Sequence, residues 1–415
     1  MDVSLPTFAD DMTLLSFSKA AMDRMLNICH SYACKWRYFY NANKCAVMIF
    51  NKKGAHEDKT FKLGKEDVQL TNCQVHLGIQ FDEDLSCRHQ LHNSSVNLRG
   101  TFISTVSNGL MANRLNPMLI GTIYTSAIRP KALFGCEALT NCSSTDLQRL
   151  LRADRFCVKY SQRFDLSINS NFAYIMLNVT PINLEIDYRK LLMLGQLCRL
   201  PSDQLAKKVF VNRLIRFVNL DRQFRGFIPD IYRILQKYGL LDYLNRFLTT
   251  GCFVSKTEWK RVLRQCINVS WRVVTLHELN STLDDRGYNA ISLEDCISLW
   301  QKKDSDPPLV QALATILNTV GHVLSRPHPR TCKRCDMRVE NLTEHRLSFC
   351  VSCEKQRKRL VYAIYDQCGV EQFNKLKRLS LKDQCSRIIG LATQCVNRQP
   401  RFPNVTLLLG RVLRS

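Results

Sequence analysis

Apolar residues follow two different periods along this chain, and the period changes after the N-terminal part. Short apolar or alternating runs predict strands at residues 12–15, 46–50 and 75–81. Between the first two runs, Ser16 and Ser18 offer N-caps for a helix. The apolar positions of that helix recur at spacings of three and four, at Met22, Met25, Leu26, Cys29 and Ala33. The N-terminal part is therefore predicted to combine short strands with a packed helix.

Helical spacing dominates the remainder of the chain. From residue 83 to about 300 the pattern predicts a succession of helices. A further helix over 309–320 is predicted to begin at Asp306-Pro307 and to end at Gly321, and residues 325–330 predict a stiff basic linker. The fold class is therefore α+β. Five segments are predicted in chain order, with the bounds 1–82, 83–160, 161–325, 331–360 and 361–415.

Two adjacent carboxylates, Asp10 and Asp11, follow the pair Phe8-Ala9 and precede an apolar run. This order suits the tip of a β-hairpin that holds divalent metal ions. Carboxylate oxygens are ligands that Mg²⁺ prefers, and two metal ions can clamp the attacking and leaving oxygens of nucleotidyl transfer. The tetrapeptide is therefore a candidate catalytic box of a template-directed polymerase.

Further segments follow the tetrapeptide in a fixed order, at Asn41 to Phe50, His76 to Gly78, Ile128 to Glu137 and Pro181 to Gly195. Together they resemble the reverse transcriptase of non-LTR (LINE-type) retrotransposons, in its C-terminal part. Phe8 to Asp11 is similar to the YADD box of that family, and Ile128 to Glu137 is similar to its thumb signature. The resemblance covers nearly the whole chain, and its specificity comes from the ordered set.

The resemblance implies a partial polymerase palm sheet, a mainly helical thumb and connector, and a small zinc-binding C-terminal module. It implies that Asp10 and Asp11 bind Mg²⁺, that Lys44 protonates the departing pyrophosphate, and that Gly78 lets the backbone approach the primer. The implied activity is that of an RNA-directed DNA polymerase, a nucleotidyltransferase acting on an RNA template and a DNA primer or target.

Only seven residues precede Phe8, whereas this family places another metal-binding aspartate on an upstream palm strand. We therefore expect a C-terminal fragment that binds nucleic acid and is inactive alone, because a two-metal site needs that ligand. The alternative is a non-catalytic zinc-containing RNA- or DNA-binding protein, or a protein-interaction module.

The chain is strongly basic, with 59 Lys and Arg residues against 36 Asp and Glu residues and a net charge of +23. Such a balance favours the phosphate backbone. Candidate phosphate contacts in the thumb-like region are Lys207, Lys208, Arg213, Arg216, Arg222 and Arg225. A second group places an aromatic ring among cations, which suits stacking on a base, and consists of Lys256, Trp259, Lys260, Arg261 and Arg264. No membrane partner is expected, because the basic residues are spread along the chain.

Soft metal ligands occur at Cys332, Cys335, His345 and Cys350, with the spacing C-x2-C-x9-H-x4-C. Four such ligands can close a tetrahedron around Zn²⁺. The spacing is equally compatible with a four-cysteine ribbon in which Cys353 replaces His345. The resemblance favours His345, since these elements carry a Cys-Cys-His-Cys motif that continues into a basic helix. The basic residues that follow are Lys355, Arg357, Lys358 and Arg359, which are implied to contact nucleic acid.

The remaining 15 of the 19 cysteines are dispersed, without the tight framework of a disulfide scaffold. The N-terminus has no apolar core of a signal peptide. We therefore expect a reducing, intracellular location, in the nucleus, the cytoplasm or both.

Overall fold

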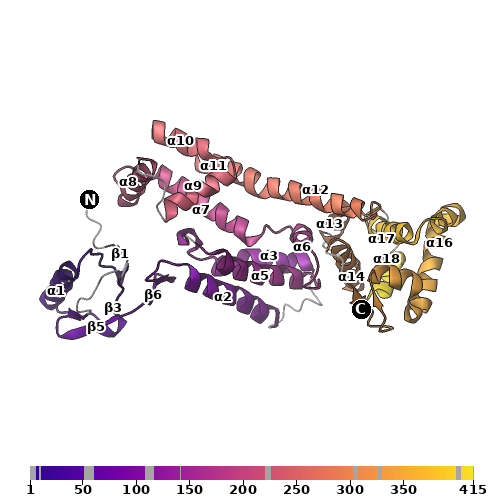
Figure 1. Cartoon of the computed structure of the whole chain (residues 1–415), viewed down its shortest axis with the longest axis horizontal. Helices are drawn as coiled ribbons and strands as arrows, with labels where there is room; N and C mark the ends of the chain where they lie inside the picture. Colours follow the sequence, from indigo (N-terminus) through magenta and orange to yellow (C-terminus); the bar gives the residue numbers. More distant parts are fainter. Residues whose placement is uncertain are drawn as a thin grey trace. The chain divides into compact units, whose positions relative to one another are not determined.

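The computed structural model describes residues 6–8, 11–50, 60–107, 116–140, 142–219, 226–301, 307–325, 329–398 and 403–414. Contacts divide the chain into two compact units (Figure 1). Unit 1 comprises Met1–Gln90 with Asn141–Ser143, and unit 2 comprises Leu91–Thr140 with Ser144–Ser415. Within the described ranges, no helix has both the length and the apolar character needed to cross a bilayer.

Unit 1 contains one long helix and small sheets. Helix α1 (Lys19–Trp36) begins where the sequence predicts, because the Ser18 side chain accepts a hydrogen bond from the backbone N–H of Ala21 at 3.2 Å. Its buried Leu26 packs against Phe61 and Val68 of the neighbouring strands. The short 3₁₀ helix η1 (Ala42–Lys44) follows.

The strands of unit 1 form three separate sheets among the described residues. One is an antiparallel pair, one has a parallel and an antiparallel neighbour around a central strand, and one is a hairpin. In that order they are β1 (Thr7–Phe8) with β2 (Asp11–Met12); β3 (Ala46–Val47), β5 (Glu66–Leu70) and β4 (Phe61–Leu63); and β6 (Cys73–His76) with β7 (Ile79–Asp82). The strands expected to share one palm sheet do not do so within this described part.

The predicted strand over 75–81 is wrong, because this segment reverses direction at Leu77 and Gly78 to form the β6–β7 hairpin. Both turn residues have positive φ, 49° at Leu77 and 76° at Gly78. A two-residue hairpin turn of this kind needs positive φ at both positions, which glycine adopts without strain. The turn therefore gives Gly78 a structural reason that is independent of any primer.

Unit 2 is helical apart from one small hairpin in its described residues. Helix α2 (Arg88–Ser107) begins in the last residues of the first segment of unit 1 and continues into unit 2 from Leu91. The helices from residue 117 to residue 199 are α3 (Pro117–Ile123), η2 (Tyr124–Ile128), α4 (Arg129–Ala132), η3 (Cys136–Ala138), α5 (Ser144–Ser161), α6 (Ser170–Leu177) and α7 (Ile182–Arg199).

The helices that follow α7 surround one hydrophobic core, called the aromatic core below because it contains Phe210, Phe247 and Trp259. Two further helices come after them, α13 (Leu293–Gln301) and α14 (Pro307–Val323). The helices around the aromatic core are α8 (Leu205–Asn219), α9 (Phe227–Lys237), α10 (Leu241–Thr250), α11 (Lys256–Leu263), the π-helical segment η4 (Arg264–Val269) and α12 (Ser270–Asp285). The C-terminal part contains β8 (Arg330–Thr331), β9 (Arg338–Val339), α15 (Leu342–Glu344), η5 (His345–Phe349), η6 (Val351–Cys353), α16 (Glu354–Lys377), α17 (Leu381–Arg398) and α18 (Pro403–Leu413).

Trp259 lies at the centre of the aromatic core, with no exposed surface. Its indole Nε1 donates to the Leu191 carbonyl of α7 at 2.7 Å. Gly195, one turn further along α7, faces the same ring so closely that an added Cβ would overlap it. The segment Pro181 to Gly195, noted for its sequence, thus contains the glycine that accommodates this tryptophan.

A buried polar network joins the segment Ile128 to Glu137 to α5, α6 and α7. The Asp154 carboxylate, which has no exposed surface, accepts hydrogen bonds from the hydroxyls of Tyr124 and Tyr174 and from the backbone N–H of Ile182. The Arg129 guanidinium lies 3.9 Å from Asp154 and donates to the Thr180 carbonyl at 2.6 Å. A buried carboxylate with this many donors is satisfied, so the segment Ile128 to Glu137 holds helices together here.

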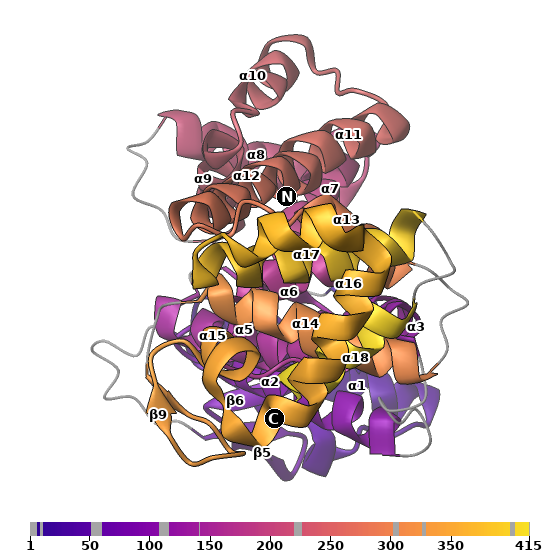
Figure 2. The same cartoon turned by 90° about the vertical axis from the view of Figure 1, so that its right-hand side faces the viewer.

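The C-terminal helices of unit 2 pack closely on α14 and α13 (Figure 2). A Cβ added at Gly410 of α18 would lie 2.7 Å from the Cβ of Ala312 on α14, so the two helix backbones approach at this point. Gly321 was predicted to end the helix over 309–320, and this is wrong: α14 continues to Val323. Gly321 instead makes room for Ile168 and Phe172, which an added Cβ would approach to 3.0 and 3.1 Å. Asp306 lies outside the described residues.

Candidate metal centre

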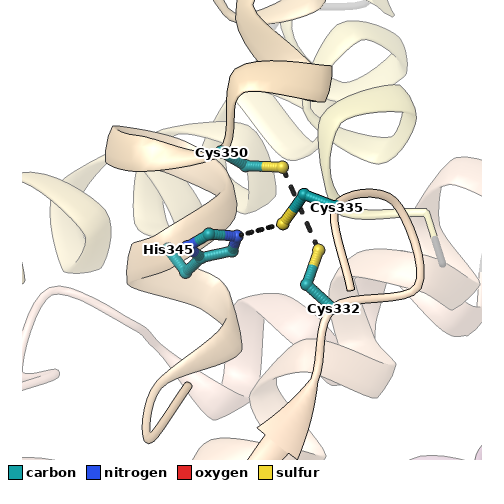
Figure 3. A group of neighbouring side chains, drawn as sticks. All are labelled: Cys332, Cys335, His345 and Cys350. Carbon is teal, nitrogen blue, oxygen red and sulfur yellow. Dashed lines mark hydrogen bonds between the residues drawn. The ribbon is translucent and has the colours of Figure 1, made fainter. Parts of the chain in front are cut away.

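The first two cysteines of the predicted zinc motif lie at a tight turn of the β8–β9 hairpin. The backbone N–H of Cys332 donates to the Met337 carbonyl at 2.8 Å, and the N–H of Asp336 donates to the Cys332 carbonyl at 2.8 Å. Asp336 has a left-handed backbone, with φ of 55°, a conformation that aspartate tolerates better than most residues. The turn brings the thiols of Cys332 and Cys335 to the same side (Figure 3).

The other two ligands come from a short helix. Asn341 caps α15 by accepting hydrogen bonds from the N–H groups of Thr343 and Glu344. The chain then widens into the π-helical segment η5, which begins at His345. The N–H of Cys350 donates to the His345 carbonyl at 2.7 Å, so one wide turn holds both ligands. π-Helical turns are rare in proteins, and those that occur often lie at functional sites.

The four ligand atoms of Cys332, Cys335, His345 and Cys350 all lie within 4.8 Å of one another. The Cys332 and Cys350 sulfurs are 4.0 Å apart, and the Cys335 sulfur is 3.1 Å from His345 Nε2 (Figure 3). Zn–S bonds of about 2.3 Å and a Zn–N bond of about 2.0 Å would place two sulfurs about 3.8 Å apart and a sulfur and a nitrogen about 3.5 Å apart in a tetrahedron. The cluster therefore fits a metal ion of zinc's size, and the sulfurs are too far apart for a disulfide.

Cys353 lies outside this group. Its sulfur accepts a hydrogen bond from Arg334 Nη1 at 3.2 Å and donates to the Val412 carbonyl at 3.8 Å. The structure therefore groups His345, and not Cys353, with the three cysteines. Cys353 is buried beside α18.

Arginines surround the thiols. Burial opposes ionisation of Cys332, but hydrogen bonds from the Arg334 backbone, the Arg346 side chain and Cys335 together outweigh it and lower the pKa of this thiol to about 6. Burial raises the pKa of Cys350. Three thiolates and one neutral imidazole around Zn²⁺ carry one net negative charge. The guanidinium groups of Arg334 and Arg346 can balance this charge, as residues beyond the direct ligands commonly do.

The same two arginines tie the cluster to the end of α18. Arg334 donates to the carbonyls of Arg411 and Arg414 at 2.7 and 3.1 Å, and Arg346 donates to the carbonyl of Leu413. The last carbonyls of a helix have no partner within it and attract positive charge. The segment 331–360, predicted as a module of its own, therefore contacts the surrounding helices of unit 2 through these bonds.

The candidate Mg²⁺ ligands are placed only in part. The β1–β2 hairpin exists, with Phe8 opposite Asp11, and Asp11 is exposed. Asp10 lies outside the described residues. Lys44 is exposed at the end of η1, and its role in proton transfer stays a prediction, as does the Mg²⁺ site.

Two candidate nucleic-acid contacts are wrong, because their side chains are buried. Trp259 cannot stack on a base from the centre of the core. Lys207 is buried, and its Nζ donates to the Cys198 carbonyl at 2.6 Å. Of the other candidate phosphate contacts in that group, Lys208, Arg213 and Arg216 are exposed, whereas Arg222 and Arg225 lie outside the described residues.

The basic residues after the cluster lie on α16 as predicted. Lys355 and Arg359 are exposed, and Lys358 pairs with Glu354 at 2.8 Å. Arg357 is half-buried and donates to the Cys350 carbonyl at 3.1 Å, so it supports the cluster. Lys256 and Arg261 are exposed and Lys260 is half-buried on α11.

Sequence reasoning missed the roles of Arg334 and Arg346. Both stand next to the ligands in the chain, Arg334 between Cys332 and Cys335 and Arg346 directly after His345. That position was an available signal, since cations near thiolates lower the thiol pKa. Their contacts with α18 had no signal, because α18 is more than 50 residues away in the sequence.

Comparison with known proteins identifies no relative: no family model, curated protein or solved structure matches this chain.

Proposed function

We propose that this chain is the C-terminal part of a reverse transcriptase of the non-LTR retrotransposon type, in which a zinc centre positions a nucleic-acid-binding helix. The proposal is carried by one observation, the grouping of Cys332, Cys335, His345 and Cys350 directly before the basic helix α16. The ordered resemblance of the segments from Phe8 to Gly195 supports the polymerase identity.

The zinc centre and α16 are coupled through short connections. α16 begins at Glu354, four residues after the ligand Cys350, and Arg357 in its first turns bonds the Cys350 carbonyl. The opposite face carries the buried Leu360 and Ile364. A metal bound at the cluster would fix the start of α16 and leave Lys355 and Arg359, one helical turn apart, facing solvent. Zn²⁺ thus supplies rigidity and no reaction step.

Metal analysis of single variants tests the zinc centre. We expect one zinc per chain in the parent protein and none in Cys350→Ser or His345→Ala, because a three-ligand site with one position open loses most of its affinity. Cys353→Ser is the matched control, since it alters a neighbouring buried thiol that contacts Arg334, and it should keep zinc. Loss of zinc in Cys353→Ser together with retention in His345→Ala would establish the four-cysteine ribbon.

The second candidate function is non-catalytic nucleic-acid binding. It is favoured by one observation: among the described strands, β1 and β2 pair only with each other, so no described neighbour brings a third carboxylate beside Asp11. In both readings, a protein of these 415 residues should show no primer extension on poly(rA)·oligo(dT) with Mg²⁺. Incorporation that disappears in Asp10→Ala would contradict this and would mean that another acid completes the site. An in-frame transcript continuing upstream of Met1 with a further palm aspartate would favour the polymerase over the second candidate.

A further inference from the structure

One face of the helix formed by α11 and η4 carries four cations. Lys256, Lys260, Arg261 and Arg264, with Thr257 and Gln265, line an open groove of about 530 Å³. None of these four cations has a carboxylate within ion-pair distance among the described residues. The groove lies in unit 2, away in sequence from the zinc cluster.

The opposite face of the same helix is anchored. Trp259, Leu263 and Ile267 are buried in the aromatic core, and the indole of Trp259 bonds α7. The backbone remains helical through the π segment η4 into α12, so the groove stands on one continuous element (Figure 1). The four cations are therefore held in a fixed array, with only their flexible ends free.

This array is unfavourable for the isolated helix. Lys256 and Lys260, and Lys260 and Arg264, are like-charged pairs at a spacing of four, which destabilise a helix. Other helices of this chain place a carboxylate at that spacing, as in Lys358 with Glu354 and Lys375 with Glu371. A bound polyanion would remove the repulsion on α11, because among the described residues no acid, Glu258 of the same helix included, forms an ion pair with these four cations.

We propose that this face binds the sugar-phosphate backbone of a nucleic-acid strand, independently of base sequence. The identity of the polyanion rests on the proposed function; the site itself rests on the array. The four cations lie within nine residues, whose eight helical rises cover about 12 Å, and one strand of a duplex has a phosphate about every 3.4 Å along its axis. Three or four phosphates can therefore be contacted, with the Thr257 hydroxyl and the Gln265 amide as neutral donors.

Salt-dependent binding of a fluorescent 30-nucleotide oligo(dT) tests the site in the full chain. The variant K256Q/K260Q/R261Q/R264Q keeps side-chain length and helix propensity. The matched control R149Q/R233Q/K237Q/K375Q removes the same charge from exposed cations that already face carboxylates. Each phosphate contact contributes about 0.9 (duplex) or 0.7 (single strand) to the slope of log K against log salt. We expect the groove variant to flatten the slope by about 2–3, and the control by less than 1.

The folded state is checked by zinc content and thermal unfolding, which should be unchanged in the groove variant or slightly improved by the loss of repulsion. A third variant, K355Q/R359Q, reports on α16. Equal slopes for the groove variant and the parent, with a reduced slope for the α16 variant, would overturn the groove and leave the proposed function intact. Absence of binding by the parent would overturn both. Displacement of oligo(dT) by polyglutamate as effectively as by unlabelled oligo(dT) would also overturn the assignment, in favour of an acidic protein partner.

Discussion

Single residues in this chain act mainly through close packing, and Gly195 is the clearest case. Its position on α7 lies against the Trp259 ring. We expect Gly195→Ala to lower the free energy of unfolding, because overpacking a core costs about 1–3 kcal/mol, more than the roughly 1 kcal/mol gained by alanine in a helix interior. Urea denaturation followed by tryptophan fluorescence measures this difference.

Gly100→Ala is the matched control for that substitution. Gly100 is an exposed glycine inside α2, and an added Cβ would meet no atom within 4 Å. Only the helix-propensity gain should remain there, so the variant should be equally stable or more stable. A similar loss of stability in both variants would show that the Trp259 contact is not the cause.

Residue identities could be predicted where the chemistry is local to the chain. The candidate ligands Cys332, Cys335 and Cys350 and the cap Ser18 follow from spacing and residue type, whereas the choice of His345 over Cys353 needed the family resemblance. The burial of Trp259 could not be predicted, because a tryptophan flanked by cations in the sequence can point its ring either toward a bound base or into the core. The burial of Arg129 and Asp154 in one network likewise depends on contacts between residues 25 positions apart.

Elements were predictable in type and less so in their ends. Apolar spacing identifies α1 and α14, since a helix buries every third or fourth residue. The predicted helix end at Gly321 was wrong because a glycine that ends a helix and a glycine that permits close packing cannot be distinguished in the sequence. The β6–β7 hairpin was missed because its turn pair, Leu77-Gly78, lacks the Asn or Asp that usually precedes glycine there.

The π-helical segments form a class of element that the sequence concealed. The described helices contain three of them, η2, η4 and η5. They contain Tyr124 of the buried network, Arg264 of the groove and His345 of the candidate metal site. A π turn inserts one residue into a helix. This changes the spacing of the apolar residues too little for the π turn to be recognised in one sequence.

At the scale of the whole molecule, metal binding at the candidate site and the packing of unit 2 are expected to depend on each other. The Cys332 thiol bonds the Arg334 backbone and the Arg346 side chain. The side chains of these two arginines hold the last carbonyls of α18, and α18 packs on α14 through Gly410 and Ala312. Unit 1 has a separate small core around Leu26, Phe61 and Val68. Metal loss should therefore act on unit 2 and spare the core of unit 1.

Hydrogen–deuterium exchange with and without a zinc chelator measures this dependence. A hydrogen bond to a charged group contributes about 1.5–3 kcal/mol, and each 1.4 kcal/mol is about a tenfold change in an equilibrium. Loss of even one such bond should therefore speed exchange in α18 by about tenfold or more, while the amides of α1 stay unchanged as the internal reference. Arg334→Ala should keep zinc, since it removes no ligand, yet reproduce much of the faster exchange in α18. Slow exchange in α18 after complete removal of zinc would contradict the dependence. Faster exchange in both α18 and α1 would indicate general unfolding instead of a local link between the metal and α18.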